Sequence, residues 1–480
     1  MIYRSTRSHG HEVTAAQAIV QGLAPDGGLF VPKEFPAAFT PAGLQELFAL
    51  PYQELAKSIL ERFLPDYSSQ QLEAIVQGAY GSQWDDDRIT PLTTEKAGSH
   101  YLELFHGPTL AFKDVALQCL PRLMKTALAN SADQRGIVIL TATSGDTGTA
   151  AMRGFQALEK TRVIVFYPYQ GVAPIQLKQM LSENSANTVA VAVEGNFDQA
   201  QSRVKQIFND PDMNSLLAQH DLTFSSANSM NIGRLLPQVV YYFAAYGQLL
   251  DQGAIKPGDP VNFSVPTGNF GDILAGYYAK KLGLPVGRLI CASNKNNVLT
   301  DFFKTGKYDK KRDFYVTNSP SMDILVSSNL ERLLFDLCQD PDLVKSLMEQ
   351  LTSKGEYQLP EEMRAKLDGF WADYATPEEI EGEIKRVHQE SGYVIDPHTA
   401  VASLAAKHFK EQVAAPGPTV VLSTASPFKF PETVYHAISG QAVKEKGLPA
   451  LKQLTDLVGS LPPAMEAFLG RSSQEIVIPA

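Results

Sequence analysis

The chain is poor in cysteine, has no excess of positive charge and lacks a long apolar run, and each absence excludes a class of protein. Its 480 residues include three cysteines, Cys119, Cys291 and Cys338. None of them forms a C-x-x-C pair or the spacing of a metal finger, so we expect reduced cysteines in a cytoplasmic protein. The 42 lysines and arginines are outnumbered by 52 aspartates and glutamates, which gives a formal net charge of −10. This balance argues against a protein whose main role is to bind nucleic acid or an anionic membrane, while a small anionic ligand is compatible with it.

No segment predicts a signal peptide or a membrane span. The N-terminal sequence has no apolar core of the kind that signal peptides carry. The most apolar helical stretch, Leu235–Leu250, is interrupted by Gln238, Gly247 and Gln248, which indicates a buried helix. With 44% hydrophobic and 20% charged residues, the composition is that of an ordinary globular protein. At about 150 residues per domain, the length predicts two to three domains.

The hydrophobic pattern changes near residue 95, and we expect three units. Residues 1–95 predict a helical and extended N-terminal domain, because Pro41–Leu64 and Gln70–Ala79 carry apolar residues at helical spacing. Residues 96–245 predict a smaller α/β domain. Residues 246–480 predict a larger α/β domain with a helical elaboration at about 325–410.

From residue 100 onward, short apolar runs alternate with amphipathic stretches. The strand candidates are Ile137–Thr143, Arg162–Tyr167, Thr188–Val193, Val261–Val265, Leu289–Ala292 and Thr419–Leu422. The helix candidates that follow four of them are Thr149–Leu158, Ile175–Leu181, Phe197–Phe208 and Asp272–Leu282. Strand, turn and helix repeated in this way predict an α/β fold with parallel sheets flanked by helices.

A glycine-rich turn, Pro266–Asp272, follows the Val261 strand candidate and precedes a helix candidate. Glycines let the backbone approach a ligand closely, and the free N–H groups of a helix N-terminus attract an anion. The turn has neither the Lys-Ser/Thr of a nucleotide P-loop nor the GxGxxG of a dinucleotide fold, so a different phosphate is expected. Taken alone, it is also compatible with a tight connection in which the glycines serve only the geometry.

A second turn, Thr141–Thr149, carries five hydroxyls and two glycines at the end of the Ile137 strand candidate. Hydroxyls and helix N–H groups together can bind a carboxylate or a phosphate at the edge where ligands lie in open α/β sheets. A helix cap from Ser144 or Asp146 needs a single side chain. The surplus of hydroxyls therefore favours a binding role.

Lys113 directly follows the apolar run Leu110–Phe112. A lysine in apolar surroundings can lose its proton and form a Schiff base, although most lysines are solvated surface charges. Asp114 beside it is expected to fix the local structure. A reactive lysine and a phosphate turn in one α/β chain are what pyridoxal phosphate requires.

The motifs that carry these features resemble those of the threonine synthase family. In chain order they are HGPTLAFKD, TATSGDTGTAA, SANSMNIGRLLPQ, VPTGNFGD, PSMDILVSSNLERLLF and DPHTA, and the N-terminal RSTRSHG and APDGGLFVP are also similar. The resemblance spans nearly the whole chain and is to the longer form found in bacteria and fungi. It implies the fold of the tryptophan synthase β subunit, which is fold type II among pyridoxal-phosphate enzymes.

The resemblance also implies roles for individual residues. Lys113 matches the lysine that forms a Schiff base with the cofactor, and Thr424 matches the hydroxyl residue at the pyridine nitrogen. The cofactor phosphate would be bound by Gly268, Asn269, Phe270, Gly271 and Asp272. The substrate carboxylate would be received by Thr143, Ser144, Gly145, Asp146 and Thr147. A further segment lining the site comprises Ser226, Asn228, Ser229, Asn231 and Arg234, of which Arg234 is the candidate for the substrate phosphate, with Lys429 as a second.

Two positions depart from the family pattern. Asp146 stands where relatives in the wider fold commonly have Asn, and an anion near the cofactor's 3′ oxygen would behave differently. Ser426 stands where many family members have His. His398, in the DPHTA motif, is expected to order a turn, and the pair His9 and His11 lacks a third ligand for a metal.

The reaction that the resemblance implies is the conversion of O-phospho-L-homoserine and water to L-threonine and phosphate, the last step of threonine biosynthesis. A phospho-lyase that releases 2-oxobutyrate and phosphate is an alternative on the same scaffold. A non-catalytic ligand sensor is a second alternative, disfavoured because Lys113 and both turns are intact. The sequence leaves the oligomeric state open.

Overall fold

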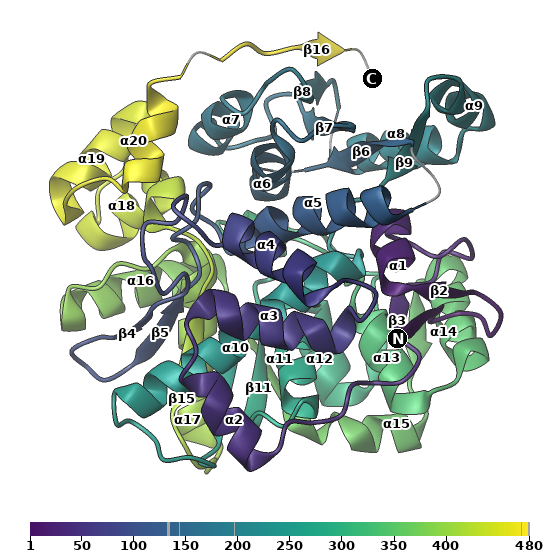
Figure 1. Cartoon of the computed structure of the whole chain (residues 1–480). Coiled ribbons are helices and arrows are strands. Elements are labelled where there is room, and N and C mark those ends of the chain that lie inside the picture. Colours follow the sequence, from purple (N-terminus) through teal and green to yellow (C-terminus); the bar gives the residue numbers. More distant parts are fainter. Residues whose placement is uncertain (132–134, 144, 196, 472, 479–480) are drawn as a thin grey trace.

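The computed structural model describes residues 1–131, 135–143, 145–195, 197–471 and 473–478. Two sheets of parallel strands form its framework, and helices flank both (Figure 1). The predicted α/β fold is therefore confirmed. Within the described residues, no helix is long and apolar enough to cross a membrane.

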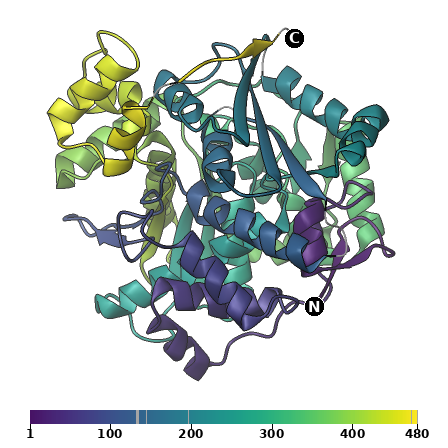
Figure 2. The ribbon, with the colours of Figure 1, turned by 45° about the horizontal axis from the view of Figure 1, so that its top comes forward.

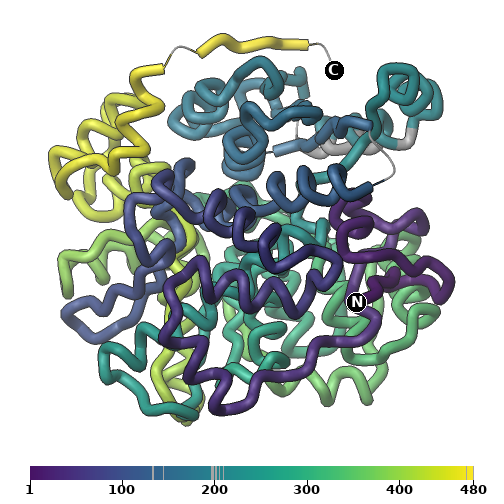
Figure 3. Tube along the Cα trace, viewed as in Figure 1, coloured from purple at the N-terminus to yellow at the C-terminus, as the bar shows by residue number. Residues whose placement is uncertain are grey.

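The N-terminal part combines a small antiparallel sheet with four helices. The sheet has the order β2-β1-β3 and consists of β1 (Ile2–Ser5), β2 (Glu12–Thr14) and β3 (Phe30–Pro32). The helices are α1 (Ala15–Gln21), α2 (Pro41–Phe48), α3 (Tyr52–Phe63) and α4 (Ser69–Ala79). The amphipathic run Pro41–Leu64 forms two helices, because the residue before Pro51 is disfavoured in a helical conformation. The sheet lies against a later helix, where Arg7 pairs with Glu331 at 2.6 Å (purple beside green in Figure 3).

The first large sheet has five parallel strands in the order β16-β8-β7-β6-β9. They are β6 (Gly136–Ala142), β7 (Thr161–Pro168), β8 (Thr188–Val193), β9 (Leu222–Ser225) and β16 (Val477–Ile478). Its helices are α6 (Asp146–Phe155), α7 (Pro174–Leu181), α8 (Phe197–Asn209) and α9 (Pro211–Gln219). The sequence pattern did not reveal β16, which comes from the C-terminal part of the chain and forms the edge strand beside β8 (Figure 2).

The second large sheet has six strands in the order β14-β11-β10-β15-β5-β4, and only β4 is antiparallel to its neighbour. The strands are β4 (Leu92–Thr94), β5 (His100–Glu103), β10 (Val261–Pro266), β11 (Val286–Ser293), β14 (Phe370–Tyr374) and β15 (Thr419–Ser423). Strands β4 and β5 lie on either side of the expected boundary at residue 95, yet both belong to this sheet. The three-part division of the chain stays a prediction.

Further helices follow from residue 232 onward, and several of them pack on the six-stranded sheet. They are α10 (Ile232–Asp251), α11 (Gly271–Lys281), α12 (Val298–Thr305), α13 (Leu330–Cys338), α14 (Pro341–Ser353), α15 (Glu361–Ala365), α16 (Pro377–Ser391), α17 (Pro397–Gln412), α18 (Pro431–Ser439), α19 (Leu448–Val458) and α20 (Pro463–Leu469). Two short strands, β12 (Lys307–Asp309) and β13 (Glu356–Gln358), pair antiparallel. The region expected to be a helical elaboration, about 325–410, contains α13 to α17. The apolar stretch Leu235–Leu250 lies within the buried helix α10, as predicted.

Helix α5 (Lys113–Asn130) lies between the two large sheets (Figure 1). It packs on α6 on one side and on α4 and α10 on the other, and most of its residues are buried. The buried apolar residues around it form one continuous cluster from the N-terminal helices to both sheets. A residue at the N-terminus of α5 is therefore held where the two halves of the molecule meet.

Candidate active site

The pairing of β15 with β5 determines where Lys113 lies. Beyond β5, the chain continues alongside the end of β15: the Leu104 N–H donates to the Ser423 carbonyl (2.9 Å) and the Phe112 N–H to the Thr424 carbonyl (2.8 Å). Lys113 then begins α5. Two residues that are far apart in the sequence, Lys113 and Thr424, are thus brought to one place, as the expected site requires.

The Lys113 amine is buried, with 9% of the residue exposed. Its Nζ lies 3.4 Å from Ser321 Oγ and 3.6 Å from Asp146 Oδ2. Burial lowers the pKa of Lys113, the charges of Lys429 and Arg234 lower it further, and Asp146 opposes the change. A lowered pKa gives the amine a larger neutral fraction, which is the nucleophilic form.

Asp114 fixes the loop that leads to Lys113. Its carboxylate accepts hydrogen bonds from the Thr109 N–H (2.8 Å) and the Thr109 hydroxyl (2.7 Å). A Cβ on Gly107 would lie 2.6 Å from the Asp114 Cβ, so this close approach requires glycine. Asp114 therefore has the local structural role that the sequence predicts.

The turn after β10 presents free backbone N–H groups at the N-terminus of α11. Phe270 precedes the helix in the left-handed conformation (φ 62°), and no side chain caps the helix. Among the described residues, the N–H groups of Asn269, Phe270 and Gly271 donate no hydrogen bond. A Cβ on Gly268 would lie 3.0 Å from the Ser321 carbonyl oxygen, so the glycine permits a close contact there. The uncapped turn has the geometry of an anion site.

Asp272, in the first turn of α11, is buried beneath this turn. Its Oδ1 accepts hydrogen bonds from the hydroxyls of Tyr241 and Tyr242, and its Oδ2 has no partner among the described residues. Burial raises the pKa of Asp272 to about 7, although the two tyrosine hydroxyls oppose this. A neutral Asp272 removes a negative charge from a turn that would bind an anion.

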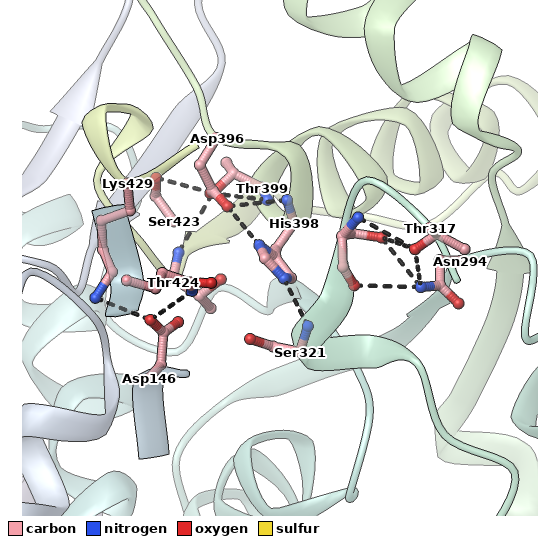
Figure 4. Close-up of polar contacts among 12 residues, drawn as sticks. Asp146, Asn294, Thr317, Ser321, Asp396, His398, Thr399, Ser423, Thr424 and Lys429 are labelled. Carbon is pink, nitrogen blue, oxygen red and sulfur yellow. Dashed lines mark hydrogen bonds and ion pairs between the residues drawn. The ribbon is translucent and has the colours of Figure 1, made fainter. Parts of the chain in front are cut away.

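Ser321 joins the Lys113 amine to the uncapped turn, since its hydroxyl faces Lys113 and its carbonyl faces Gly268. The Ser321 N–H donates to His398 Nε2 (3.1 Å), and His398 Nδ1 lies 2.7 Å from Asp396 Oδ2 (Figure 4). Asp396 is also the N-cap of α17. His398 therefore orders the Ser321 segment, which is the turn-ordering role that the sequence predicts.

A second set of contacts holds the same segment against the end of β11. Asn294 Nδ2 donates to Thr317 Oγ1 (2.9 Å) and to Asp323 Oδ1 (2.7 Å). The Thr317 hydroxyl also donates to Asp323 Oδ1 at 2.7 Å. Figure 4 shows this cluster beside His398, on the side away from Lys429 and Asp146. The Ser321 segment is thus held both by His398 of α17 and by Asn294 at the end of β11.

The hydroxyl-rich turn after β6 uses several of its hydroxyls within the protein. Thr143 Oγ1 accepts the N–H groups of Gly145 (3.0 Å) and Gly148 (3.1 Å), which caps α6. The Thr149 hydroxyl donates to the Gly145 carbonyl (3.2 Å), and the Thr141 hydroxyl to Asn228 Oδ1 (2.8 Å). The surplus that favoured a binding role is therefore smaller than the sequence suggests. Ser144 lies outside the described residues, and the roles of Thr143, Gly145 and Thr147 toward a substrate stay predictions.

Asp146 begins α6 and lies between two ammonium groups. Its Oδ1 is 2.9 Å from Lys429 Nζ, and its Oδ2 is 3.6 Å from Lys113 Nζ. Burial alone would raise the pKa of Asp146, but Lys429 and Lys113 outweigh it and hold the pKa well below its usual range. Asp146 is thus an ionised carboxylate beside the reactive amine.

Asn231 and Arg234, at the start of α10, differ in how many of their polar atoms have partners within the protein. Asn231 is the N-cap of α10, and its amide also donates to the carbonyls of Ile19 (2.9 Å) and Ser226 (2.8 Å). Arg234 is buried and donates to the Ala227 carbonyl (3.1 Å), but its Nε has no partner and it pairs with no acid among the described residues. Burial lowers the pKa of Arg234 to about 10.

The other members of the segment make local contacts. The Asn228 N–H donates to Ser226 Oγ (3.2 Å), and the Ser229 carbonyl accepts from Asn329 Nδ2 (3.2 Å). Whether Ser226, Asn228, Ser229 and Asn231 meet a substrate stays a prediction.

Several residues that complete the site were not assigned from the sequence. Ser321, Gln176, Gln179 and Asp396 all contact the residues around Lys113. Ser321 and Asp396 lie in the quoted motifs PSMDILVSSNLERLLF and DPHTA, which was the available signal. Gln176 and Gln179 are ordinary helix residues of α7, and no pattern marks them.

No group of three or more metal-ligating side chains occurs in the part of the chain that the structure describes. His9 lies 3.4 Å from Asp342, and His11 lies 3.2 Å from Gln21. The cysteines form no disulfide among the described residues.

Comparison with protein families gives three matches along the chain. A family model described as "Pyridoxal-phosphate dependent enzyme" matches residues 89–425. Models described as "Threonine synthase N terminus" and "Threonine synthase, C-terminal" match residues 2–80 and 399–471.

Individual relatives are similar over nearly all of the chain. Threonine synthase from Pseudomonas aeruginosa is 40% identical over 460 residues, which cover 95% of this chain and 93% of that protein. Threonine synthase-like 1 from Macaca fascicularis is 41% identical over 96% of this chain, and the chain spans 62% of the length of that protein. The crystal structure of PLP-bound threonine synthase from Brucella melitensis has a TM-score of 0.88 at 38% identity and covers 100% of this chain and 96% of that one.

Proposed function

The chain belongs to the threonine synthase family of pyridoxal-phosphate-dependent enzymes, and from this membership we propose that it converts O-phospho-L-homoserine and water to L-threonine and phosphate. The membership confirms the expected fold type II and the pyridoxal phosphate cofactor. The observation that carries the proposal is a buried lysine with a lowered pKa that Ser321 connects to an uncapped, glycine-containing helix N-terminus.

The residues present fit the cofactor. The uncapped turn at Gly268–Gly271 offers free N–H groups to its phosphate, and Ser321 connects this turn to the Lys113 amine. Lys113 would hold its aldehyde carbon, and Thr424, at the end of β15, would face its ring nitrogen. When bound, pyridoxal phosphate supplies an electron-accepting ring that stabilises negative charge on the substrate carbon next to the amine.

Lys113 has two roles in the proposed reaction. Its neutral amine is the nucleophile that holds the cofactor between turnovers, and once the substrate amine replaces it, the same amine takes the α proton as a general base. Loss of a β proton allows phosphate to depart from the γ carbon, and the γ carbon then takes up a proton and becomes the methyl group. The oxygen of water adds to the β carbon, the proton that this water releases balances the one taken up by the departed phosphate, and Lys113 returns the α proton.

Arg234 is proposed to bind the phosphate of the substrate. A buried guanidinium without an acidic partner is unfavourable unless an anion completes it, and Arg234 Nε is in this situation. The guanidinium fork can hold a phosphate through two parallel hydrogen bonds. The turn at Thr143–Thr147 is proposed to receive the substrate carboxylate, with α6 supplying the positive end of its dipole.

Product analysis tests this function. Purified protein is supplied with pyridoxal phosphate and O-phospho-L-homoserine, and threonine, 2-oxobutyrate and phosphate are measured over time. Equal amounts of threonine and phosphate are expected. Equal amounts of 2-oxobutyrate and phosphate would instead identify a phospho-lyase, and a protein that holds the cofactor but releases no product would be the ligand sensor.

We also propose that the substrate is the protein's functional partner, with no nucleic acid and no membrane, and that the protein is cytoplasmic. These proposals rest on the acidic net charge and the sparse, unpaired cysteines. The proposal that nucleic acid is not a partner is checked by titrating the protein with the cofactor in the presence and absence of nucleic acid. The cofactor affinity should be the same in both titrations.

A further inference from the structure

Lys429 is a fully buried cation in the short turn Pro427–Lys429 that follows β15. Its Nζ lies 2.9 Å from Asp146 Oδ1, 2.7 Å from the Thr109 carbonyl and 3.0 Å from Gln179 Oε1. Two of the donors of this ammonium group go to Thr109 and Gln179, and Asp146 forms an ion pair with it. Three protein oxygens therefore already surround the Lys429 amine, which argues against the substrate-phosphate contact expected for it.

The contacts of Lys429 converge on the surroundings of Lys113. Thr109 belongs to the loop that Asp114 pins before Lys113, and Asp146 is the carboxylate nearest to the Lys113 amine. Gln176 Nε2 donates to Asp146 Oδ1 at 2.9 Å, so two neighbours fix that oxygen. The other oxygen, Oδ2, faces Lys113. Figure 4 shows Lys429 and Asp146 directed toward each other beside Thr424.

We propose that Lys429 is a positioning residue that aims Asp146 at Lys113 and offsets part of its negative charge, and that it does not bind the substrate phosphate. This inference rests on the proposed function. The physical reason is that an ammonium 2.9 Å from one carboxylate oxygen fixes that oxygen and weakens the attraction that the other oxygen exerts on Lys113. Among the described residues, the charges that act on Lys113 are Asp146, Lys429 and Arg234, and His398 also faces Asp146.

The same arrangement makes a prediction about the proton on Lys113. With Lys429 in place, Asp146 is shared between two ammonium groups, and the Lys113 amine is near a like charge. Without Lys429, Lys113 is the remaining cation against Asp146, so it holds its proton more tightly. Without Asp146, Lys113 loses its nearest anion and releases its proton more readily. The two substitutions therefore act in opposite directions.

The experiment measures the proton on Lys113 in the full chain after removal of the cofactor. Competitive labelling with acetic anhydride across pH, read by mass spectrometry of the Lys113 peptide, gives the midpoint of its titration. We expect Lys429→Met to raise this midpoint by about one pH unit and Asp146→Asn to lower it by a similar amount. Lys446→Met, the same change at an exposed lysine, should leave the midpoint unchanged. An unchanged or lowered midpoint in Lys429→Met would overturn the proposal.

Steady-state kinetics of the loaded enzyme separate positioning from phosphate binding. If Lys429 acts through Asp146, Lys429→Met lowers kcat about tenfold or more with KM within threefold, and the double variant is no slower than Asp146→Asn alone. A rise in KM of tenfold or more at unchanged kcat would instead assign Lys429 to the substrate phosphate.

The inference can still be tested if Lys429→Met folds poorly or if the proposed reaction is not observed. If Lys429→Met folds poorly, the double variant is used, because a neutral pair of similar volume should restore the Tm that the single change lowers. Failure of that rescue would show that Lys429 has partners more important than Asp146. The labelling profile needs no substrate, so it decides this inference even if product analysis rejects threonine formation.

Discussion

The turns that begin α6 and α11 share sequence features and have similar places in the fold. They differ in whether their backbone N–H groups have partners and in the charge of their first aspartate. Each comes after a parallel strand, contains glycine, and places a buried aspartate in the first turn of its helix. At α6, Thr143 accepts the N–H groups of Gly145 and Gly148, and Asp146 is ionised between two ammonium groups. At α11, the N–H groups are free and Asp272 has a pKa of about 7.

The difference shows that the helix dipole does not by itself decide the charge of a residue at its N-terminus. Both helices favour an anion there. At α6, the anion is supplied by the protein, as Asp146, and lysines neutralise it. At α11, the protein supplies tyrosine hydroxyls in place of cations, the carboxyl tends toward its neutral form, and the free N–H groups are left for a phosphate from outside.

The largest effect on activity is expected from removing Lys113, the amine that faces Asp146 at the α6 turn. We expect Lys113→Ala to lower turnover at least about 10³-fold, because it removes both the nucleophile and the general base. The measurement is product formation, together with borohydride reduction, which should no longer attach the cofactor to the chain. Lys446→Ala serves as the control, and full turnover of Lys113→Ala would refute the site.

Neutralising each aspartate in turn should change stability in opposite directions at pH 8. Asp146→Asn leaves Lys429 buried without its anion and should cost about 3 kcal/mol of unfolding free energy. Asp272→Asn should stabilise the protein by on the order of 2 kcal/mol. At pH 8 the wild-type carboxyl is mostly ionised although it is buried, and this costs stability that a neutral amide does not. Thermal unfolding of the chain without cofactor measures both changes, and equal signs would refute the contrast.

The pH dependence of stability should also differ between the two aspartates, Asp272 and Asp146. Because the folded pKa of Asp272 lies above its unfolded value, folding takes up a proton between about pH 4 and pH 7, and this contribution to stability is lost as pH rises through 7. For Asp146, whose folded pKa is lowered, the contribution is present above about pH 4 and is lost on acidification. Asp272→Asn should therefore flatten the fall in Tm between pH 5 and pH 8, and Asp146→Asn should not.

A smaller effect is expected from closing the uncapped turn. In Gly268→Ala the new Cβ would lie 3.0 Å from the Ser321 carbonyl, so the turn and the Ser321 segment must separate. We expect the Kd for pyridoxal phosphate to rise about tenfold, which corresponds to about 1.4 kcal/mol. Gly382→Ala is the matched control, since a Cβ there meets nothing within 4 Å. Equal affinities in the two variants would contradict the assignment of this turn.

The smallest effect concerns the cap of α6. Thr143→Val removes the acceptor for two N–H groups and should destabilise the protein by about 1 kcal/mol, as loss of a helix cap usually does. Thr40→Val, at the cap of α2, should cost a similar amount. Cofactor affinity should stay within twofold in both variants. A tenfold loss of affinity in Thr143→Val would mean that this turn also holds the cofactor.

Part of this site could be predicted from the sequence because the turn at Gly268–Gly271 and Thr424 closely follow strand candidates. Lys113 was assigned from its apolar neighbours and its motif, and Thr424 from the family resemblance. The pairing of β5, β10 and β15 places these segments at one edge of the sheet. The sequence could not predict which side-chain donors and acceptors bond within the protein and which are left for a ligand. Nothing in the sequence indicates that three hydroxyls of the turn at Thr141–Thr149 are used internally, or that three protein oxygens already surround the Lys429 amine.

The limits in the fold have similar causes. Pro41–Leu64 has one continuous helical pattern, and only the restriction imposed by Pro51 divides it into α2 and α3. Strands β4, β5 and β16 are short, and their places depend on partners far away in the sequence. The hydrophobic periodicity of a segment indicates whether it is a helix or a strand and which side is buried. It does not indicate which distant segment a strand pairs with.

The register that pairs Val420 with His100 also sets the order of events during synthesis. Strands β6 to β9 are made close together, so most of the five-stranded sheet can assemble while the ribosome is still translating. The six-stranded sheet cannot be completed until β15 has emerged, and local contacts form faster than distant ones. The site around Lys113 therefore stays incomplete until Thr424 has emerged, and a nascent chain can bind its cofactor only after β15 has been synthesised.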